Sequence, residues 1–187
     1  MDAIRVAVIY GSTRSGRFCD TVVRWTLERL AASNKFQMDV IDPADPAAGS
    51  PMDGRPPQPL QQRLGQADAF VIVTPEYNHG YPAPLKALID SCGTEWHAKP
   101  VAFVSYGGVS GGLRAVEQLR LVFAELHAVT IRDSVSFPGA WEQFDQSGAL
   151  RNPERAQKSM ETLLARLIWW AAALRSARST SPYTLSA

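Results

Sequence analysis

Short apolar runs alternate with segments of helical periodicity along this chain, and that alternation constrains the fold more than any other feature. The runs are rich in β-branched residues, which is typical of strands covered on both faces. They lie at residues 4–9, 36–41, 69–74, 99–105 and 129–137, the last interrupted near Arg132 and Asp133. Alternating strands and helices favour a parallel sheet between two helical layers, because right-handed crossovers return each strand to the same sheet.

The segments between the runs carry apolar residues at helical spacing. Helices are predicted at residues 18–32, 60–67, 84–91 and 113–127, and from a cap at Asn152 to about Arg178. A Pro-rich connection, residues 42–59, shows no periodicity. The pattern predicts a flavodoxin-like three-layer α/β/α sandwich with a five-stranded parallel sheet in the order 2-1-3-4-5. We expect one domain over residues 1–178 and a frayed tail at 179–187.

Composition excludes several classes of function. Nineteen basic and eighteen acidic residues give a formal charge of +1, which offers no broad attraction to nucleic acid or an anionic membrane. The most apolar late stretch, residues 163–174, is interrupted by Arg166 and is too short to span a bilayer. Cys19 and Cys92 are the only cysteines and suggest neither a disulfide framework nor a zinc site. Together with the lack of a secretion signal at the amino terminus, this predicts a cytoplasmic protein with a small-molecule partner.

The loop after the first strand, residues 11–17 (GSTRSGR), has the chemistry of an anion site. It joins a strand to a helix amino terminus, where unpaired N–H groups and the helix dipole favour phosphate, and its two arginines add forked donors. Arg17 and Phe18 stand where an NTPase P-loop needs Lys and Ser/Thr, and the loop is not GxGxxG, so NTP and dinucleotide sites are disfavoured. A phosphate monoester fits better, the alternative being a capped turn with solvated arginines.

Two further loops follow the third and fourth strands. The first, residues 75–82 (PEYNHGYP), offers flat Tyr and Pro faces that suit a planar ring, although such residues also occur in ordinary turns. The second, residues 105–108 (SYGG), has glycines that let the backbone approach a flat ligand. In a 2-1-3-4-5 sheet the loops after strands one, three and four cluster beside the topological switch point, where such sheets bind ligands.

These segments resemble the NAD(P)H-dependent FMN reductase family, including its quinone- and azo-reductase-like members. The resemblance rests on GSTRSGRFC at residues 11–19, PEYNHGYPAPLKALID at 75–90 and SYGG at 105–108, and extends from about residue 4 to 137. It implies FMN as cofactor and NADPH or NADH as co-substrate. Many members carry Ser and Asn where this chain has Arg17 and Cys19.

The resemblance also implies roles for individual residues. The FMN phosphate would be held by Ser12, Arg14, Ser15 and Arg17. The isoalloxazine would be lined by Pro75, Glu76, Tyr77 and Asn78. Its other edge would meet Ser105, Tyr106, Gly107 and Gly108. His79 is the candidate to meet the electron acceptor, and we expect no metal site and no catalytic side chain, because the flavin carries the chemistry.

Several residues allow a second interpretation. Glu76 could be a base, but a role in shaping the loop is favoured, and Cys19 lies on an apolar helical stripe, which favours a structural thiol over a reactive one. In the last helix one arc is apolar: Met160, Leu163, Leu164, Leu167, Ala171 and Leu174. Trp169 projects near the opposite side, which indicates an interface, the alternative being that loops of the same subunit cover it. Leu121 and Val122 point the same way, and the resemblance implies a homodimer or homotetramer.

The leading hypothesis is an oxidoreductase that passes hydride from NAD(P)H through FMN to a quinone, azo compound, metal oxyanion or free flavin. A flavodoxin-like electron carrier is a second hypothesis, although the charge of +1 does not match the acidic character of such carriers. A flavin-binding, redox-sensing partner protein is a third.

Overall fold

The computed structural model describes residues 3–45 and 58–183, in which five strands form one parallel sheet in the order β2-β1-β3-β4-β5. The strands are β1 (Ile4–Tyr10), β2 (Phe36–Ile41), β3 (Ala69–Pro75), β4 (Pro100–Gly107) and β5 (Val129–Pro138). Every residue of β3 and β4 is buried, as expected for strands covered on both faces and paired on both edges. The predicted sheet and strand order are confirmed.

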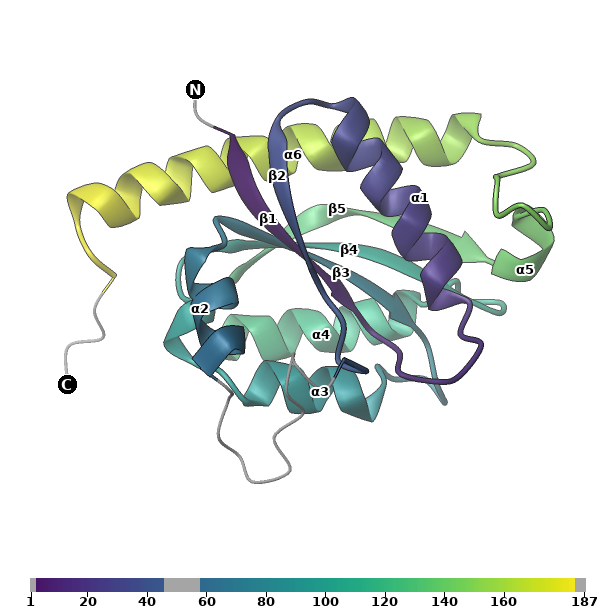
Figure 1. The fold of residues 1–187 in the computed structure, drawn as a ribbon, viewed down its shortest axis with the longest axis horizontal. Helices are drawn as coiled ribbons and strands as arrows, with labels where there is room; N and C mark the ends of the chain where they lie inside the picture. Colours follow the sequence, from purple (N-terminus) through teal and green to yellow (C-terminus); the bar gives the residue numbers. More distant parts are fainter. Residues whose placement is uncertain (1–2, 46–57, 184–187) are drawn as a thin grey trace.

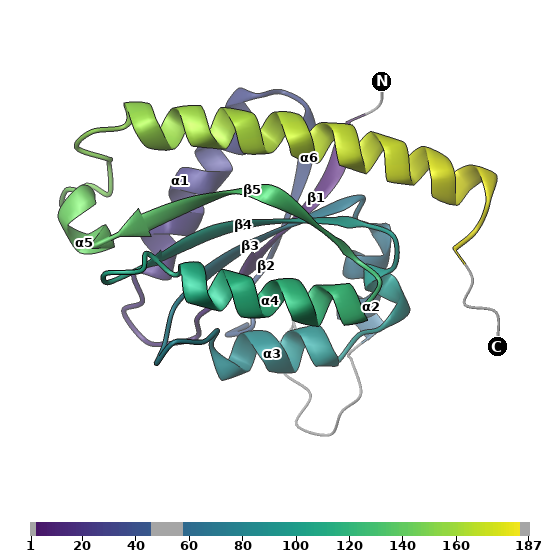
Figure 2. The ribbon, with the colours of Figure 1, turned by 180° about the vertical axis from the view of Figure 1, so that it is seen from behind.

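Helices cover both faces of the sheet (Figure 1). One face carries α1 (Cys19–Ala32) and α6 (Glu154–Thr180), and the other carries α2 (Gln58–Gln66), α3 (Ala83–Asp90) and α4 (Leu113–Glu125). Seen from behind, α6 runs alongside β5 and extends beyond it towards the carboxyl terminus (Figure 2). The three predicted layers are therefore present.

Two short helices were not predicted. These are the 3-10 turn Thr94–Trp96 and α5 (Ala140–Gln143), which follows β5. Segments of three or four residues are too short to show a periodic pattern, so sequence reasoning has no signal for them. The helix α5 lies at the end of the sheet where β4 and β5 finish (Figure 1).

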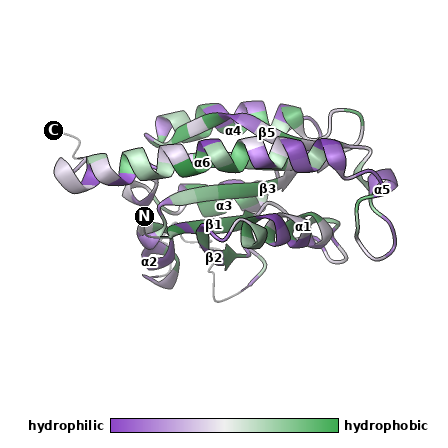
Figure 3. Cartoon of the chain, turned by 90° about the horizontal axis from the view of Figure 1, so that it is seen from above, coloured by the Kyte–Doolittle hydropathy of each residue, from purple (hydrophilic) through white to green (hydrophobic). Residues whose placement is uncertain are grey.

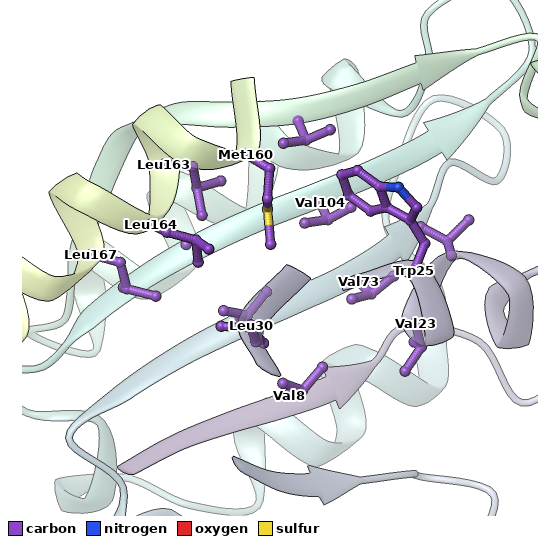
Figure 4. Packing of buried hydrophobic residues seen from close by; sticks show 14 of the residues in the cluster. Val8, Val23, Trp25, Leu30, Val73, Val104, Met160, Leu163, Leu164 and Leu167 are labelled. Atoms are coloured by element: carbon purple, nitrogen blue, oxygen red, sulfur yellow. The ribbon is translucent and has the colours of Figure 1, made fainter. Parts of the chain in front are cut away.

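The larger core lies between the sheet and the pair α1 and α6 (Figure 4). Met160, Leu163, Leu164, Leu167 and Ala171 form its α6 side, and all five are buried. They belong to the predicted apolar stripe of this helix, which is confirmed. Seen from above, β1 and β3 are coloured as hydrophobic, whereas the helices around them also carry hydrophilic stretches (Figure 3).

Three local predictions need correction or limits. The interruption predicted near Arg132 and Asp133 is an irregularity inside one continuous strand, opposite the Val101–Phe103 part of β4. The carboxyl-terminal helix continues to Thr180, and the Tyr183 hydroxyl lies 2.8 Å from His127 Nδ1, whereas residues 184–187 of the predicted tail lie outside the described residues. Of the Pro-rich connection, residues 46–57 lie outside the described residues.

A search of residues 3–45 and 58–183 finds no helix long and apolar enough to cross a bilayer.

Candidate functional site

The carboxyl ends of β1, β3 and β4 bring three loops to one edge of the sheet. β3 pairs with β1 on one side and β4 on the other, in register up to Tyr10–Val73 and Pro75–Tyr106. The chain order reverses between β1 and β3, so this edge is the topological switch point. The loops are residues 11–18, 76–82 and 108–112. Together with the strand ends at Pro75 and at 105–107, which were predicted as loop but belong to β3 and β4, they carry the sequence-predicted site.

Gly11 lets the first loop leave β1 in close contact with β3. Its N–H donates to the Val73 carbonyl at 2.7 Å, and a Cβ there would lie 2.8 Å from Thr74 Cα. Beside it, the buried Ser12 Oγ lies 2.7 Å from the Tyr77 hydroxyl, which ties the first loop to the second. The structure therefore joins two of the predicted ligand-binding segments directly.

Arg14 and the backbone around it present free donors. The guanidinium of Arg14 is exposed and lies 3.6 Å from the centre of the Tyr77 ring. Within the described part of the chain, the N–H groups of Thr13, Ser15 and Gly16 donate no hydrogen bond. Amide donors beside a helix start and an arginine that retains free N–H groups match the needs of a phosphate monoester. The donor set thus fits the phosphate end of FMN.

Arg17 is engaged differently from Arg14. Its guanidinium makes a two-pronged ion pair with Asp42, hydrogen-bonds Asp20 at 2.9 Å and donates to the Ser12 carbonyl at 2.5 Å. It also lies over the Tyr10 ring. Burial alone would raise the pKa of Asp42, but the hydrogen bonds from Arg17 hold that pKa below its usual range. Arg17 therefore fastens the first loop to the end of β2.

The second loop folds back on itself in a tight turn. Tyr77 and Gly80 exchange backbone hydrogen bonds of 2.9 and 3.1 Å, and the two residues between them, Asn78 and His79, have φ of 50° and 69°. Left-handed conformations at both central positions characterise a type I′ turn. The turn leaves Asn78 and His79 exposed at the edge of the site, with Tyr77 half-buried against the first loop.

Glu76 connects the second loop to the amino end of α4. Its carboxylate accepts hydrogen bonds from Ser110 Oγ and from Arg114 Nε, both at 2.5 Å, and from the Arg114 backbone N–H at 3.2 Å. Arg114 also lies 2.9 Å from His79 Nε2. Burial by itself would raise the pKa of Glu76, but the Ser110 and Arg114 hydrogen bonds outweigh it and lower that pKa. A carboxylate held in this way supports the predicted loop-shaping role rather than that of a base.

Replacing Glu76 with glutamine is expected to cost about 1 kcal/mol of stability at neutral pH, because the charge-assisted bonds to Arg114 become neutral. The folded-state pKa of Glu76 is lowered, so its contribution is complete above the unfolded pKa of about 4.3 and is lost as pH falls through the folded value. Urea unfolding of both proteins across that range measures it. A stability difference that stays constant as the pH is lowered would contradict the charge argument.

The third loop is held by buried contacts. Ser105 Oγ donates to the Gly111 carbonyl at 2.8 Å, and the Tyr106 ring packs in the core 5.8 Å from the Phe18 ring. These two side chains therefore anchor the loop, and only their backbone lies at the site edge. Gly107 is buried beside Glu76, whereas Gly108 is exposed.

Sequence reasoning missed the partners that fix these loops, namely Asp42, Ser110 and Arg114. Each lies at least 25 residues from the residue it holds, and no local pattern signals such a pair. Cys19 is buried, and burial raises the pKa of its thiol, which agrees with a structural role. The described residues contain no group of three His, Cys, Asp or Glu side chains placed to hold a metal ion.

Comparison with known proteins identifies the family. A family model described as NADPH-dependent FMN reductase matches residues 4–142, which include all three loops. A Schizosaccharomyces pombe protein named as an NAD(P)H-dependent FMN reductase is 38% identical over 120 residues, covering 58% of this chain and 60% of the relative. A probable NADPH:quinone oxidoreductase 2 of Oryza sativa is 30% identical over 179 residues, covering 87% of each chain.

A solved structure supports the fold. The flavoenzyme NAD(P)H:acceptor oxidoreductase FerB of Paracoccus denitrificans superposes with a TM-score of 0.65 at 23% identity, covering 91% of this chain and 98% of FerB. At that identity the likeness concerns the fold alone, and it agrees with the sheet described above. The family match covers the sheet, the helices α1 to α4 and the three site loops, and the chain belongs to the NADPH-dependent FMN reductase family.

Proposed function

We propose that this protein is an NAD(P)H-dependent oxidoreductase that uses FMN to reduce a small-molecule acceptor by a ping-pong mechanism. One observation carries the proposal. The donor-rich loop 11–18, the Tyr77–Gly80 turn and the glycine pair 107–108 lie together at the topological switch point of a chain that belongs to this family. The candidate acceptors are a quinone, an azo compound, a metal oxyanion or free flavin. The names of the relatives support a quinone or a flavin.

The first loop would hold the phosphate of FMN. Arg14, which is exposed, would supply the charge, and Ser12, Ser15 and the neighbouring N–H groups would supply neutral donors. Arg17 would not contact the phosphate directly. Its ion pair with Asp42 and its hydrogen bond to the Ser12 carbonyl hold the loop in shape. This division refines the expectation that both arginines touch the phosphate.

The second and third loops would hold the flavin ring. Pro75, Glu76, Tyr77 and Asn78 would form one wall, chiefly through backbone atoms and the Tyr77 ring. Ser105 and Tyr106 would contribute backbone, because their side chains are buried. Gly107 and Gly108 would bring peptide groups close to the ring and favour the negative charge of its reduced form.

When bound at these loops, FMN would supply the hydride chemistry between NAD(P)H and the acceptor. The protein positions the reactants: the Tyr77–Gly80 turn would orient the ring, and His79, which is exposed beside Arg114, would face the acceptor. No side chain is needed as a general base. Glu76 would keep its ion pair with Arg114 during the reaction.

Steady-state turnover tests this proposal. The purified protein, loaded with FMN, is assayed with NADH and NADPH against a quinone, an azo dye, a metal oxyanion and free FMN. Turnover with parallel double-reciprocal plots is expected for a ping-pong enzyme. A protein that neither retains nor takes up FMN would contradict the proposal, and intersecting plots would contradict the ping-pong order.

We also propose that copies of this chain associate through the outer side of α6, as a homodimer or homotetramer. Trp169 is 61% exposed there, with Ala165, Ile168 and Ala172 around it. Leu121 is 75% exposed on α4, in the opposite helical layer, and would serve a second contact in a tetramer. Large exposed apolar side chains of this kind mark interfaces. Light scattering on the protein as it elutes from a sizing column measures its mass, and a monomer at micromolar concentration would contradict this association.

The proposed location is the cytoplasm. Two buried free cysteines are consistent with it.

A further inference from the structure

One large aromatic side chain borders the candidate site without any role assigned so far. Trp141, on α5, is 60% exposed, and the tip of its indole lies 3.8 Å from where a Cβ on Gly108 would stand. Gly108 is one of the two glycines proposed to approach the flavin ring. The indole therefore lies at the border of the ring site rather than on a distant surface.

The position of Trp141 is fixed by the backbone. The Gly139 N–H donates to the Gly108 carbonyl at 2.9 Å, and the Glu142 N–H donates to the Gly139 carbonyl at 2.9 Å. Gly139 itself has a φ of 57°, a left-handed conformation in which the chain turns sharply from β5 into α5. These bonds attach α5 to the third loop, so the indole is presented beside Gly108 by a short, rigid connection.

The chain next to Gly108 also exposes apolar side chains. Val109, which follows Gly108, is 99% exposed, and Leu113 at the start of α4 is 46% exposed. Both line a cavity of about 680 Å³ that continues past Pro138 and Gly139 and is also lined by Glu142 and Arg155. Arg114, next to Leu113, is already paired with Glu76. The flat apolar surface at this border is the exposed indole itself, and an indole face suits an uncharged planar ring better than a small oxyanion.

We infer that Trp141 is a specificity-determining residue that stacks on a planar aromatic acceptor, a quinone, and so favours quinones over small inorganic acceptors. The inference rests on the proposed FMN reductase function, since it places the acceptor beside the glycine pair. Aromatic pairs prefer offset or edge contacts, and an exposed indole gains from the water that a planar ligand displaces. The indole face offers a metal oxyanion no comparable contact.

The test compares Trp141→Ala and Trp141→Phe with the native protein, all loaded with FMN. Trp141→Ala is expected to raise the KM for a naphthoquinone about 3- to 10-fold. It should leave kcat/KM for ferricyanide and the Kd for FMN unchanged. Trp141→Phe keeps an aromatic ring and should restore most of the loss. Tyr183→Ala, which removes an exposed aromatic hydrogen-bonded to His127, should leave both acceptors unaffected.

Equal losses with both acceptors, or an unchanged KM for the quinone, would overturn the inference. If Trp141→Ala loses activity equally with both acceptors and also changes its oligomeric state, the inference is overturned as well. Equilibrium dialysis of the quinone against the oxidised proteins, without NADPH, separates this inference from the reductase activity. Tighter binding to the native protein than to Trp141→Ala supports stacking even if no turnover occurs, whereas equal binding contradicts it.

Discussion

Gly11→Ala is expected to destabilise the protein by about 1–3 kcal/mol and to weaken FMN binding about tenfold or more. A Cβ at this position would stand 2.8 Å from Thr74 Cα and 2.8 Å from the Val73 carbonyl oxygen, which are backbone atoms in the centre of the sheet. The first loop would have to move away from β3. That movement breaks the Ser12–Tyr77 contact, so stability and cofactor affinity fall together.

Gly65→Ala is the matched control for this substitution. Gly65 lies in α2, and a Cβ there meets nothing within 4 Å. Alanine in a helix is more favourable than glycine by up to about 1 kcal/mol, so this variant should be as stable as the native protein or slightly more so. Urea unfolding and FMN titration measure both. A Gly11→Ala protein with native stability and native FMN affinity would show that the close contact with β3 is unimportant.

Arg14→Ala is expected to raise the Kd for FMN by roughly 10- to 150-fold, while the fold keeps its stability. The estimate corresponds to the roughly 1.5–3 kcal/mol of hydrogen bonds to a charged group. Arg14 is exposed and contacts the Tyr77 ring, so its removal leaves no cavity in the core. Because the interaction is ionic, the affinity of the native protein should also fall as salt is added.

Two variants complete the Arg14 experiment. Arg14→Lys keeps the charge but loses the forked donors, so its Kd should lie between those of the native protein and Arg14→Ala. Arg132→Ala removes an arginine whose side chain is 94% exposed on β5 and should leave the Kd unchanged. Equal FMN affinities for Arg14→Ala and Arg132→Ala would show that Arg14 makes no contact with the phosphate.

The fold could be predicted from the sequence because its signals are local. The run Ala69–Pro75 is too short for a helix and rich in β-branched residues, which favours a buried strand. The spacing of Met160, Leu163 and Leu167 defines one face of a helix. The alternation of such units then limits the topology. The short helix α5 has no such signal, so the sequence does not predict that Trp141 lies beside the site.

The site was only partly predictable, since its shape depends on contacts between distant residues. The order of the loops located the site, but the sequence does not reveal that Arg17 is paired with Asp42, or that Glu76 is held by Arg114. From the sequence alone, an arginine in a loop suited to phosphate is assigned to phosphate binding. The structure shows that the carboxylate of Asp42 occupies the guanidinium of Arg17 instead. Burial likewise decides the role of Tyr106, whose ring faces the core.

The most direct test of the account is anaerobic stopped-flow mixing of the FMN-loaded protein with NADPH, followed by a quinone. NADPH is expected to bleach the visible absorbance of the flavin without any second protein, and the quinone is expected to restore it. Flavin that stays oxidised with both NADPH and NADH, and is reduced only when a separate reductase is added, would identify an electron carrier and contradict the proposed enzyme.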